Sequence, residues 1–219
     1  STIQGSYAFG VGMAAGTRSS QFIDETIRPE VTIARWIDML GAALTLGVVT
    51  FAFGVWRPGA SQGLASRDDR FLALMRAGWA AAGAGILLGL LAQAATVTNG
   101  SILGSITDGS AVRILTDSSY APIWIGRVMV WAVYGAVLAT APSRPALWSA
   151  LFGLGIGLAV LPSLISHARA LGSFDALIND MAHRTSAALW VGGLIAWISA
   201  IWPDLPLTAK PVSRAVTRF

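Results

Sequence analysis

The stretch that decides the fold runs from Trp36 to Trp56 and reads WIDMLGAALTLGVVTFAFGVW. Asp38 is its only charged residue, and Arg35 and Arg57 stand at its two ends. About 20 predominantly apolar residues in a row match the hydrocarbon thickness of a bilayer. The stretch therefore predicts a helix that spans a membrane.

Further apolar runs of similar length follow this one along the chain. They cover approximately residues 75–96, 122–141, 146–166 and 177–202. The chain of 219 residues is 54% hydrophobic and only 12% charged, which is far from the composition of a soluble domain. The sequence predicts an all-α integral membrane protein, a bundle of about five transmembrane helices with a short extramembrane N-terminal strand and linker.

Three regions are expected: a strand and linker at 1–34, the helical membrane domain at 35–203, and a basic tail at 204–219. From Ser1 to Gly12, apolar residues alternate with small or polar ones, which is typical of a strand. A single strand cannot bury itself. We expect it either to complete a sheet formed elsewhere or to remain an ordered tail.

The basic residues are distributed unevenly between the two predicted sides of the membrane. The segments after spans one and three, with the C-terminal tail, carry eight basic and three acidic residues, against seven and eight in the remainder. By the positive-inside rule the C-terminus of this multi-pass protein is cytoplasmic, and the N-terminus lies on the other side of the membrane. Topology thus explains the pI of about 10.3, and no nucleic-acid partner is expected.

Ionisable residues gather at the predicted outer ends of the spans. They are Asp38, Arg127, His167, Asp180, His183 and Arg184. Charged groups are costly at membrane depth, so they mark a functional site by default. Asp180 and His183, three residues apart, share a helical face. The alternative is that both histidines lie at the membrane interface and bond to headgroups or loop carbonyls.

The chain contains no cysteine, so histidine, methionine and carboxylate side chains are the available ligands for a transition metal. Imidazole suits copper, zinc, iron and nickel, and thioether selects Cu(I), so this set leans towards copper. Met39 and Met181 adjoin two of the acidic residues. Adjacent residues point to different helical faces, so packing explains both methionines equally well.

Several segments resemble the copper resistance D (CopD) family of inner-membrane proteins. SHA at 166–168, followed by DMAHRTSAALWVGGL from Asp180 to Leu194, is similar to a histidine that precedes the family's acidic-x-x-His helix. Ala34 to Pro58 resembles the family's first helix, and Thr116 to Val130 resembles a segment that includes its arginine, here Arg127. GSYAFGVG at 5–12 is similar to the closing strand of the periplasmic copper resistance C (CopC) domain.

The resemblance implies a copper-handling protein of copper transport or resistance in a bacterial inner (plasma) membrane. Its N-terminus would be periplasmic, with a metal site at the periplasmic end of the bundle. The expected ligands are His167, His183, Asp180 and Met181. Supporting ion pairs are expected from Asp38, Arg127 and Arg184, with Arg127 pairing with Asp38 or Asp180. Expected partners are the lipid bilayer, a copper ion, and a periplasmic copper-binding domain or other membrane subunits.

Two other functions fit the same residues. The two histidines on facing helices would bind a b-type haem axially in an electron-transfer module, because haem needs one histidine on each side of its iron. Alternatively, the chain is an accessory or structural subunit of a larger membrane complex. We do not expect an enzyme, because the sequence lacks a glycine-rich phosphate loop and a nucleophile with a nearby base.

Overall fold

The computed structural model describes residues 28–57, 66–141, 146–165 and 173–201. Within these ranges the regular structure is entirely helical, without any strand. Four helical stretches are long and apolar enough to cross a membrane: Pro29–Trp56, Asp68–Val97, Ala121–Thr140 and Leu147–Ile165. The predicted class, an all-α membrane protein, is confirmed. The proposed strand near the N-terminus, His167 and the basic tail lie outside the described residues.

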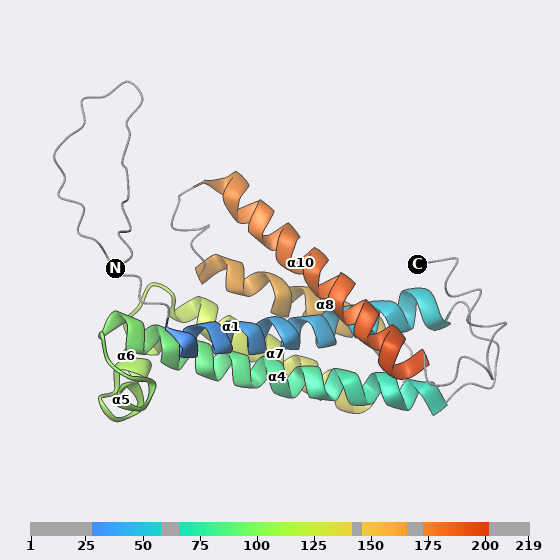
Figure 1. Ribbon diagram of the computed structural model, residues 1–219, viewed down its shortest axis with the longest axis horizontal. Coiled ribbons are helices and arrows are strands. Elements are labelled where there is room, and N and C mark those ends of the chain that lie inside the picture. The colour runs from blue at the N-terminus through green and yellow to red at the C-terminus, as the bar shows by residue number, and fades with distance from the viewer. Residues whose placement is uncertain (1–27, 58–65, 142–145, 166–172, 202–219) are drawn as a thin grey trace, which may run out of the picture.

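The first span is one continuous helix made of successive α and π segments. These are α1 (Pro29–Ala42), η1 (Ala43–Gly47), α2 (Val48–Thr50) and η2 (Phe51–Trp56). The helix begins about two turns before Trp36 because Pro29, whose missing N–H costs nothing in a first turn, starts it. Helix α4 (Ser66–Val97) runs back alongside α1, as Figure 1 shows.

The polar segment at 97–120, between the second and third apolar runs, contains two short helices at one end of the bundle, α5 (Ile102–Thr107) and α6 (Ser110–Thr116) (Figure 1). The Ser101 side chain caps α5 by accepting a hydrogen bond from the backbone N–H of Gly104 at 3.0 Å. Gly109 precedes α6 with a φ of 70°, a conformation that favours glycine. The connection is therefore a folded segment that closes this end.

The third and fourth spans are α7 (Ala121–Thr140) and α8 (Leu147–Val160), and α8 continues into the 3-10 helix η4 (Leu161–Ile165). The sequence predicts a kink at Pro162, because proline removes a backbone hydrogen bond. The change from α to 3-10 geometry occurs there, one residue before the proline. It directs Ile165 towards the same end of the bundle as α6.

The last helix, α10 (Phe174–Ala196), continues as the π segment η5 (Trp197–Ile201). It crosses the other helices obliquely, and its first turns diverge from them (Figure 1). It packs on η1 where Gly192 meets Gly47: a Cβ atom on Gly192 would lie 2.7 Å from the Gly47 Cα. Helix α10 is not among the four candidate spans found in the described residues, and a fifth crossing stays a prediction.

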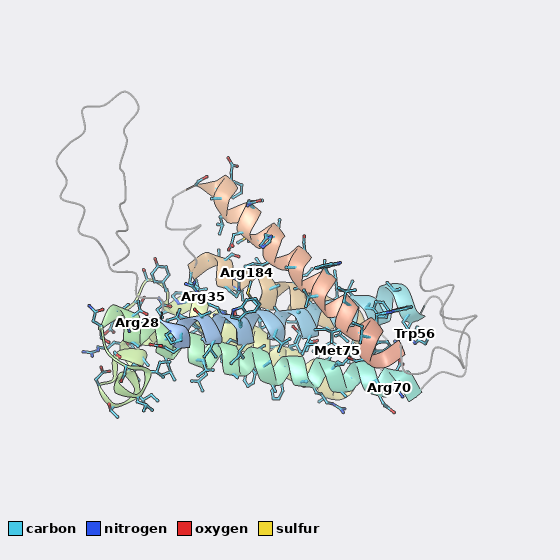
Figure 2. All side chains as sticks on the ribbon, in the orientation of Figure 1. Arg28, Arg35, Trp56, Arg70, Met75 and Arg184 are labelled. Atoms are coloured by element: carbon cyan, nitrogen blue, oxygen red, sulfur yellow. The ribbon has the colours of Figure 1, made fainter. Side chains whose placement is uncertain are left out.

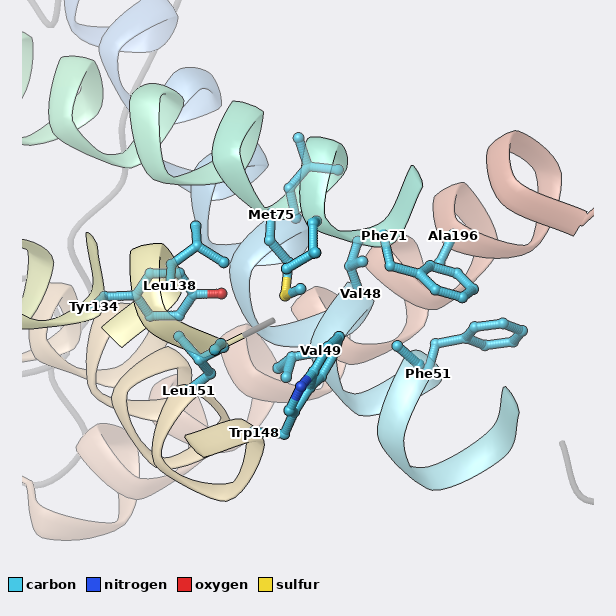
Figure 3. Close-up of a cluster of buried hydrophobic side chains, with 14 of the residues drawn as sticks. Val48, Val49, Phe51, Phe71, Met75, Tyr134, Leu138, Trp148, Leu151 and Ala196 are labelled. Atoms are coloured by element: carbon cyan, nitrogen blue, oxygen red, sulfur yellow. The ribbon is translucent and has the colours of Figure 1, made fainter. Parts of the chain in front are cut away.

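The core lies between the first span and helices α4, α7 and α8. Figure 3 shows Met75, Tyr134 and Trp148 converging on the valines of α2. The Tyr134 hydroxyl donates to the backbone carbonyl of Thr45 at 2.9 Å. Thr45 lies in a π segment, where the shifted hydrogen-bond ladder gives carbonyls room for such partners. This bond joins α7 to the first span inside an otherwise apolar core.

Helices α4 and α7 are joined by a reciprocal pair of tryptophans. The rings of Trp79 and Trp131 stack with centroids 4.8 Å apart and planes 2° apart. Each indole N–H donates to the other residue's carbonyl oxygen, at 3.0 and 2.8 Å. Gly83 and Gly135 make room for the rings, since a Cβ on either would lie 2.8 Å or less from one of them.

Candidate functional site

A partly open cavity of about 680 Å³ lies between α1, α4, α7, η4 and α10. It is at the end of the bundle where α1 and α10 begin, and Figure 2 shows Arg35 and Arg184 there. Its charged or amide side chains are those of Arg35, Asp38, Gln93, Arg127, Asp180 and Arg184. Of the ionisable residues that the sequence placed at the outer ends of the spans, four therefore surround one space: Asp38, Arg127, Asp180 and Arg184. His183 does not line it, and His167 lies outside the described residues.

Asp38 is the centre of an ion network that links three helices. One carboxylate oxygen accepts a hydrogen bond from Arg127 Nη2 of α7 at 2.5 Å, and the other lies 3.4 Å from Arg184 Nη2 of α10. The Arg127 side chain is only 4% exposed and that of Asp38 14%. Of the two carboxylates that the sequence offered as partners of Arg127, the structure brings Asp38 to it.

The position of Asp38 follows from the close approach of α1 and α4. Gly85 of α4 faces Asp38, and a Cβ on that glycine would lie 2.6 Å from the Asp38 Cα. The pattern Gly85-x-x-x-Gly89 predicts such an approach. Gly89 makes room for Trp124 instead, whose ring would lie 3.3 Å from a Cβ there. Gly85 thus allows α1 and α4 to pack closely, and Gly89 leaves space for the Trp124 ring that lines the cavity.

Trp124 and Gln93 complete the cavity wall near Arg127. The Arg127 guanidinium carbon lies 4.9 Å from the centre of the Trp124 ring, within the range of a cation–π contact. The Trp124 indole N–H donates to Gln93 Oε1 at 3.2 Å. The sequence patterns single out neither Trp124 nor Gln93 as a site residue. An amide inside the apolar run at 75–96 was the available signal for Gln93.

Arg184 lies farther from the Asp38 carboxylate than Arg127 does. Its side chain is 20% exposed, and Nε donates to the backbone carbonyl of Ala159 at 3.4 Å. This carbonyl belongs to the last turn of α8, just before the change to 3-10 geometry. Arg184 therefore connects the diverging first half of α10 both to α8 and to Asp38.

The four expected metal ligands are placed differently. Asp180 lines the cavity, Met181 is half-buried, and His183 is exposed on α10 and does not line the cavity. His167 lies outside the described residues. In the described parts of the chain, no group of three or more His, Cys, Asp or Glu side chains is placed to hold a metal ion. The ligand set therefore stays a prediction.

Arg28, which the sequence assigned to a polar linker, ties the start of α1 to the end of α4. Its guanidinium donates to the carbonyl oxygens of Ala95 at 3.2 Å and Gly100 at 3.0 Å. A cation is favourable at the C-terminal end of a helix, where carbonyls are unpaired. This contact holds the two helices together at the mouth of the cavity.

Fold and site together define an α-helical membrane protein with a buried Arg–Asp–Arg network beside a cavity at one end of the bundle. Over 97% of its length, the chain is 28% identical to the copper transport protein CutJ of Bacillus subtilis (strain 168). It spans only 41% of the length of that relative. No family profile matches the chain, and no solved structure matches it.

Proposed function

We propose that this chain handles copper, and that the metal is received or passed on at the cavity beside Asp38. The observation that carries this proposal is the likeness to a copper transport protein, which covers 97% of the chain and hence nearly the whole helical bundle. The relative is more than twice as long, so transport by this chain alone is part of the proposal. The orientation with the cavity facing the periplasm of an inner membrane belongs to the proposal too.

The chemistry around the cavity supports this assignment in part. Asp180 and Met39 line the cavity and supply a carboxylate and a thioether. Ile165, the last described residue before His167, also lines it, and one residue separates the two in the sequence. Imidazole and thioether ligands without cysteine suit copper. We propose His167 and His183 as the principal ligands, with Asp180 and Met181 beside them. Because His183 is exposed between the cavity-lining residues Asp180 and Arg184, the ion would lie at the rim of the cavity.

The proposed role of the Arg127–Asp38–Arg184 network is structural. Two guanidinium groups already share the carboxylate of Asp38, so this acid is a poor candidate for a direct ligand. Because Arg184 follows His183 directly, the contact from Arg184 to Asp38 sets the rotation of α10 at the proposed site. The network would therefore orient the histidine without touching the metal.

A copper titration of the purified protein tests the proposal. We would measure Cu(I) binding against a chromophoric chelator for the parent, His167→Ala, His183→Ala and the double variant. If both imidazoles hold one ion, each single variant loses most of the binding, and the double variant is hardly worse than either. Met181→Ala should weaken binding less, with Met129→Ala, an exposed methionine of α7, as its matched control.

The same preparation distinguishes the other candidate functions. A b-type haem would give a strong visible absorption band that both histidine variants lose. A parent protein that binds no copper and shows no such band would contradict the copper proposal and favour an accessory role in a larger membrane complex. Copper binding that persists in the double histidine variant would instead refute the proposed ligands and leave the cavity itself as the site.

A further inference from the structure

The cavity beside Asp38 carries more positive than negative charge. Three arginines and two aspartates are among the described residues that line it. Asp38 already accepts hydrogen bonds from both Arg127 and Arg184. The third arginine, Arg35 of α1, forms no ion pair with any residue that the structure describes. No arginine is among the proposed copper ligands, so this excess of positive charge needs its own explanation.

The cavity is also lined by hydrogen-bond donors that have no partner among the described residues. Gln93 accepts the indole N–H of Trp124 through Oε1, and its amide NH2 donates to no described residue. Arg184 donates through Nε and Nη2, and its Nη1 has no such partner. The guanidinium of Arg35 makes no hydrogen bond within the described ranges. Helices α1, α4 and α10 thus each supply a donor that a ligand can use.

The positive charge and the unused N–H groups together select the class of ligand. A cation in the cavity would be repelled by the arginines, and an apolar molecule would leave the N–H groups unpaired. A guanidinium presents parallel N–H groups that match the two oxygens of a carboxylate or a phosphate. An oxyanion therefore satisfies both the charge and the donors.

We propose that the cavity binds an oxyanion, a carboxylate or a phosphate group, with Arg35 as its main positive partner. Gln93 and Arg184 act as further donors. A bound oxyanion also lowers the repulsion between the arginines and a cation at the rim of the cavity. The proposal does not depend on the copper site and is tested without copper, so either of the two can fail alone.

Calorimetric titration of the copper-free protein in detergent, at constant sodium chloride, tests the proposal with inorganic phosphate and acetate. Both anions should bind the parent. Arg35→Gln should raise their dissociation constants about tenfold or more, because a charge-assisted hydrogen bond is lost. Since Arg35 is exposed and pairs with no described residue, this variant should fold.

Arg113→Gln is the matched control. Arg113 is exposed on α6, at the same end of the bundle, but does not line the cavity. This variant removes one positive charge from the same region, so it should bind both anions as the parent does. A parent that binds neither anion, unchanged binding in Arg35→Gln, or an equal loss in Arg113→Gln would overturn the proposal.

Gln93→Glu gives a second variant within the cavity. It keeps an oxygen that can accept the Trp124 indole N–H, but it replaces the amide donors and adds a negative charge. Anion binding should therefore fall about tenfold or more in this variant as well. Binding of phosphate and acetate as tight as in the parent would place the anion away from Gln93 and contradict the proposed site.

A short-chain lipid distinguishes the two sources of a phosphate group, a lipid headgroup and a free anion. The probe is dihexanoyl phosphatidate, used below its micelle concentration. A dissociation constant about tenfold lower than that of inorganic phosphate would identify a lipid headgroup as the ligand. Equal or weaker binding would identify a free anion. Either result supports the site only if Arg35→Gln weakens the binding, and phosphatidate binding that persists in that variant would contradict it.

Discussion

At the scale of single residues, Asp38 determines how the charged groups of the bundle are arranged. It is the only charged residue in the first apolar run, and its two oxygens meet arginines from α7 and α10. An isolated charge at membrane depth costs about 2.5–3.5 kcal/mol even on insertion scales. The network removes most of that cost and links three helices at the cavity.

The closeness of the Arg127–Asp38 pair predicts a large effect on stability. Arg127→Ala should lower the free energy of unfolding by about 3–5 kcal/mol, because it leaves a buried carboxylate with only the more distant Arg184. Asp68→Asn, which removes the more exposed pair with Arg57, should cost about 1 kcal/mol or less. Thermal and denaturant unfolding in detergent would measure both.

Adding Asp38→Asn to the Arg127→Ala variant shows how much of the lost stability comes from the unpaired charge and how much from lost packing. The double variant should recover part of the lost stability, since no buried carboxylate then remains beside a missing arginine. An Arg127→Ala protein as stable as the parent would contradict the network and indicate that the arginine only extends towards the membrane surface.

At the scale of elements, the angle of α10 depends on glycines. Gly192 and Gly47 allow the crossing with η1, so the first half of α10 is free to diverge above the cavity. The π segments of the first span add room for Tyr134 in the same region. Close packing at one crossing therefore positions the residues of α10 that border the site.

The crossing makes Gly192 sensitive to a single added carbon. Gly192→Ala should destabilise the bundle by about 1–3 kcal/mol, because the new Cβ would collide with backbone atoms of the first span. Gly153→Ala on α8 is the matched control, since nothing lies within 4 Å of a Cβ there. Unfolding curves that do not distinguish the two variants would refute the close crossing.

The helices were predictable because a chain that crosses a membrane can adopt few backbone structures. Backbone groups in lipid must bond within the segment, so apolar runs of sufficient length become helices. The crossing angle of α10 depends on contacts between distant segments, which no local pattern encodes. A second motif of the same kind, Gly153-x-x-x-Gly157, shows this. Gly85 of the first motif meets α1, whereas nothing lies within 4 Å of a Cβ on Gly153.

For the candidate site, the charged residues were predictable from the sequence, whereas the neighbours that complete the cavity wall were not. Charged residues inside apolar runs stand out, so the sequence identified Asp38, Arg127, Asp180 and Arg184 before their contacts were known. Gln93 stands out only as an amide inside an apolar run, and Trp124 resembles an ordinary residue of its run. Tertiary packing places both at the cavity. The rotation of α10, which exposes His183, likewise follows from the crossing with η1 and not from the spacing to Asp180.

At the scale of the whole molecule, the uneven charge predicts which end of the bundle faces outwards. Thr107 on α5 and Asp69 near the start of α4 are exposed and lie at opposite ends. An impermeant maleimide added outside intact cells should label Thr107→Cys and not Asp69→Cys. The reverse labelling pattern would place the cavity on the cytoplasmic side.

The distance from bound Cu(II) to a nitroxide label tests the central claim, that copper binds at the cavity, most directly. Thr96 lines the cavity, and Asp69 lies on the same helix about 40 Å away at 1.5 Å per residue. A label on Thr96→Cys should show strong relaxation by Cu(II), and one on Asp69→Cys almost none. Equal relaxation of both labels, or none in either after copper loading, would contradict a copper site at the cavity.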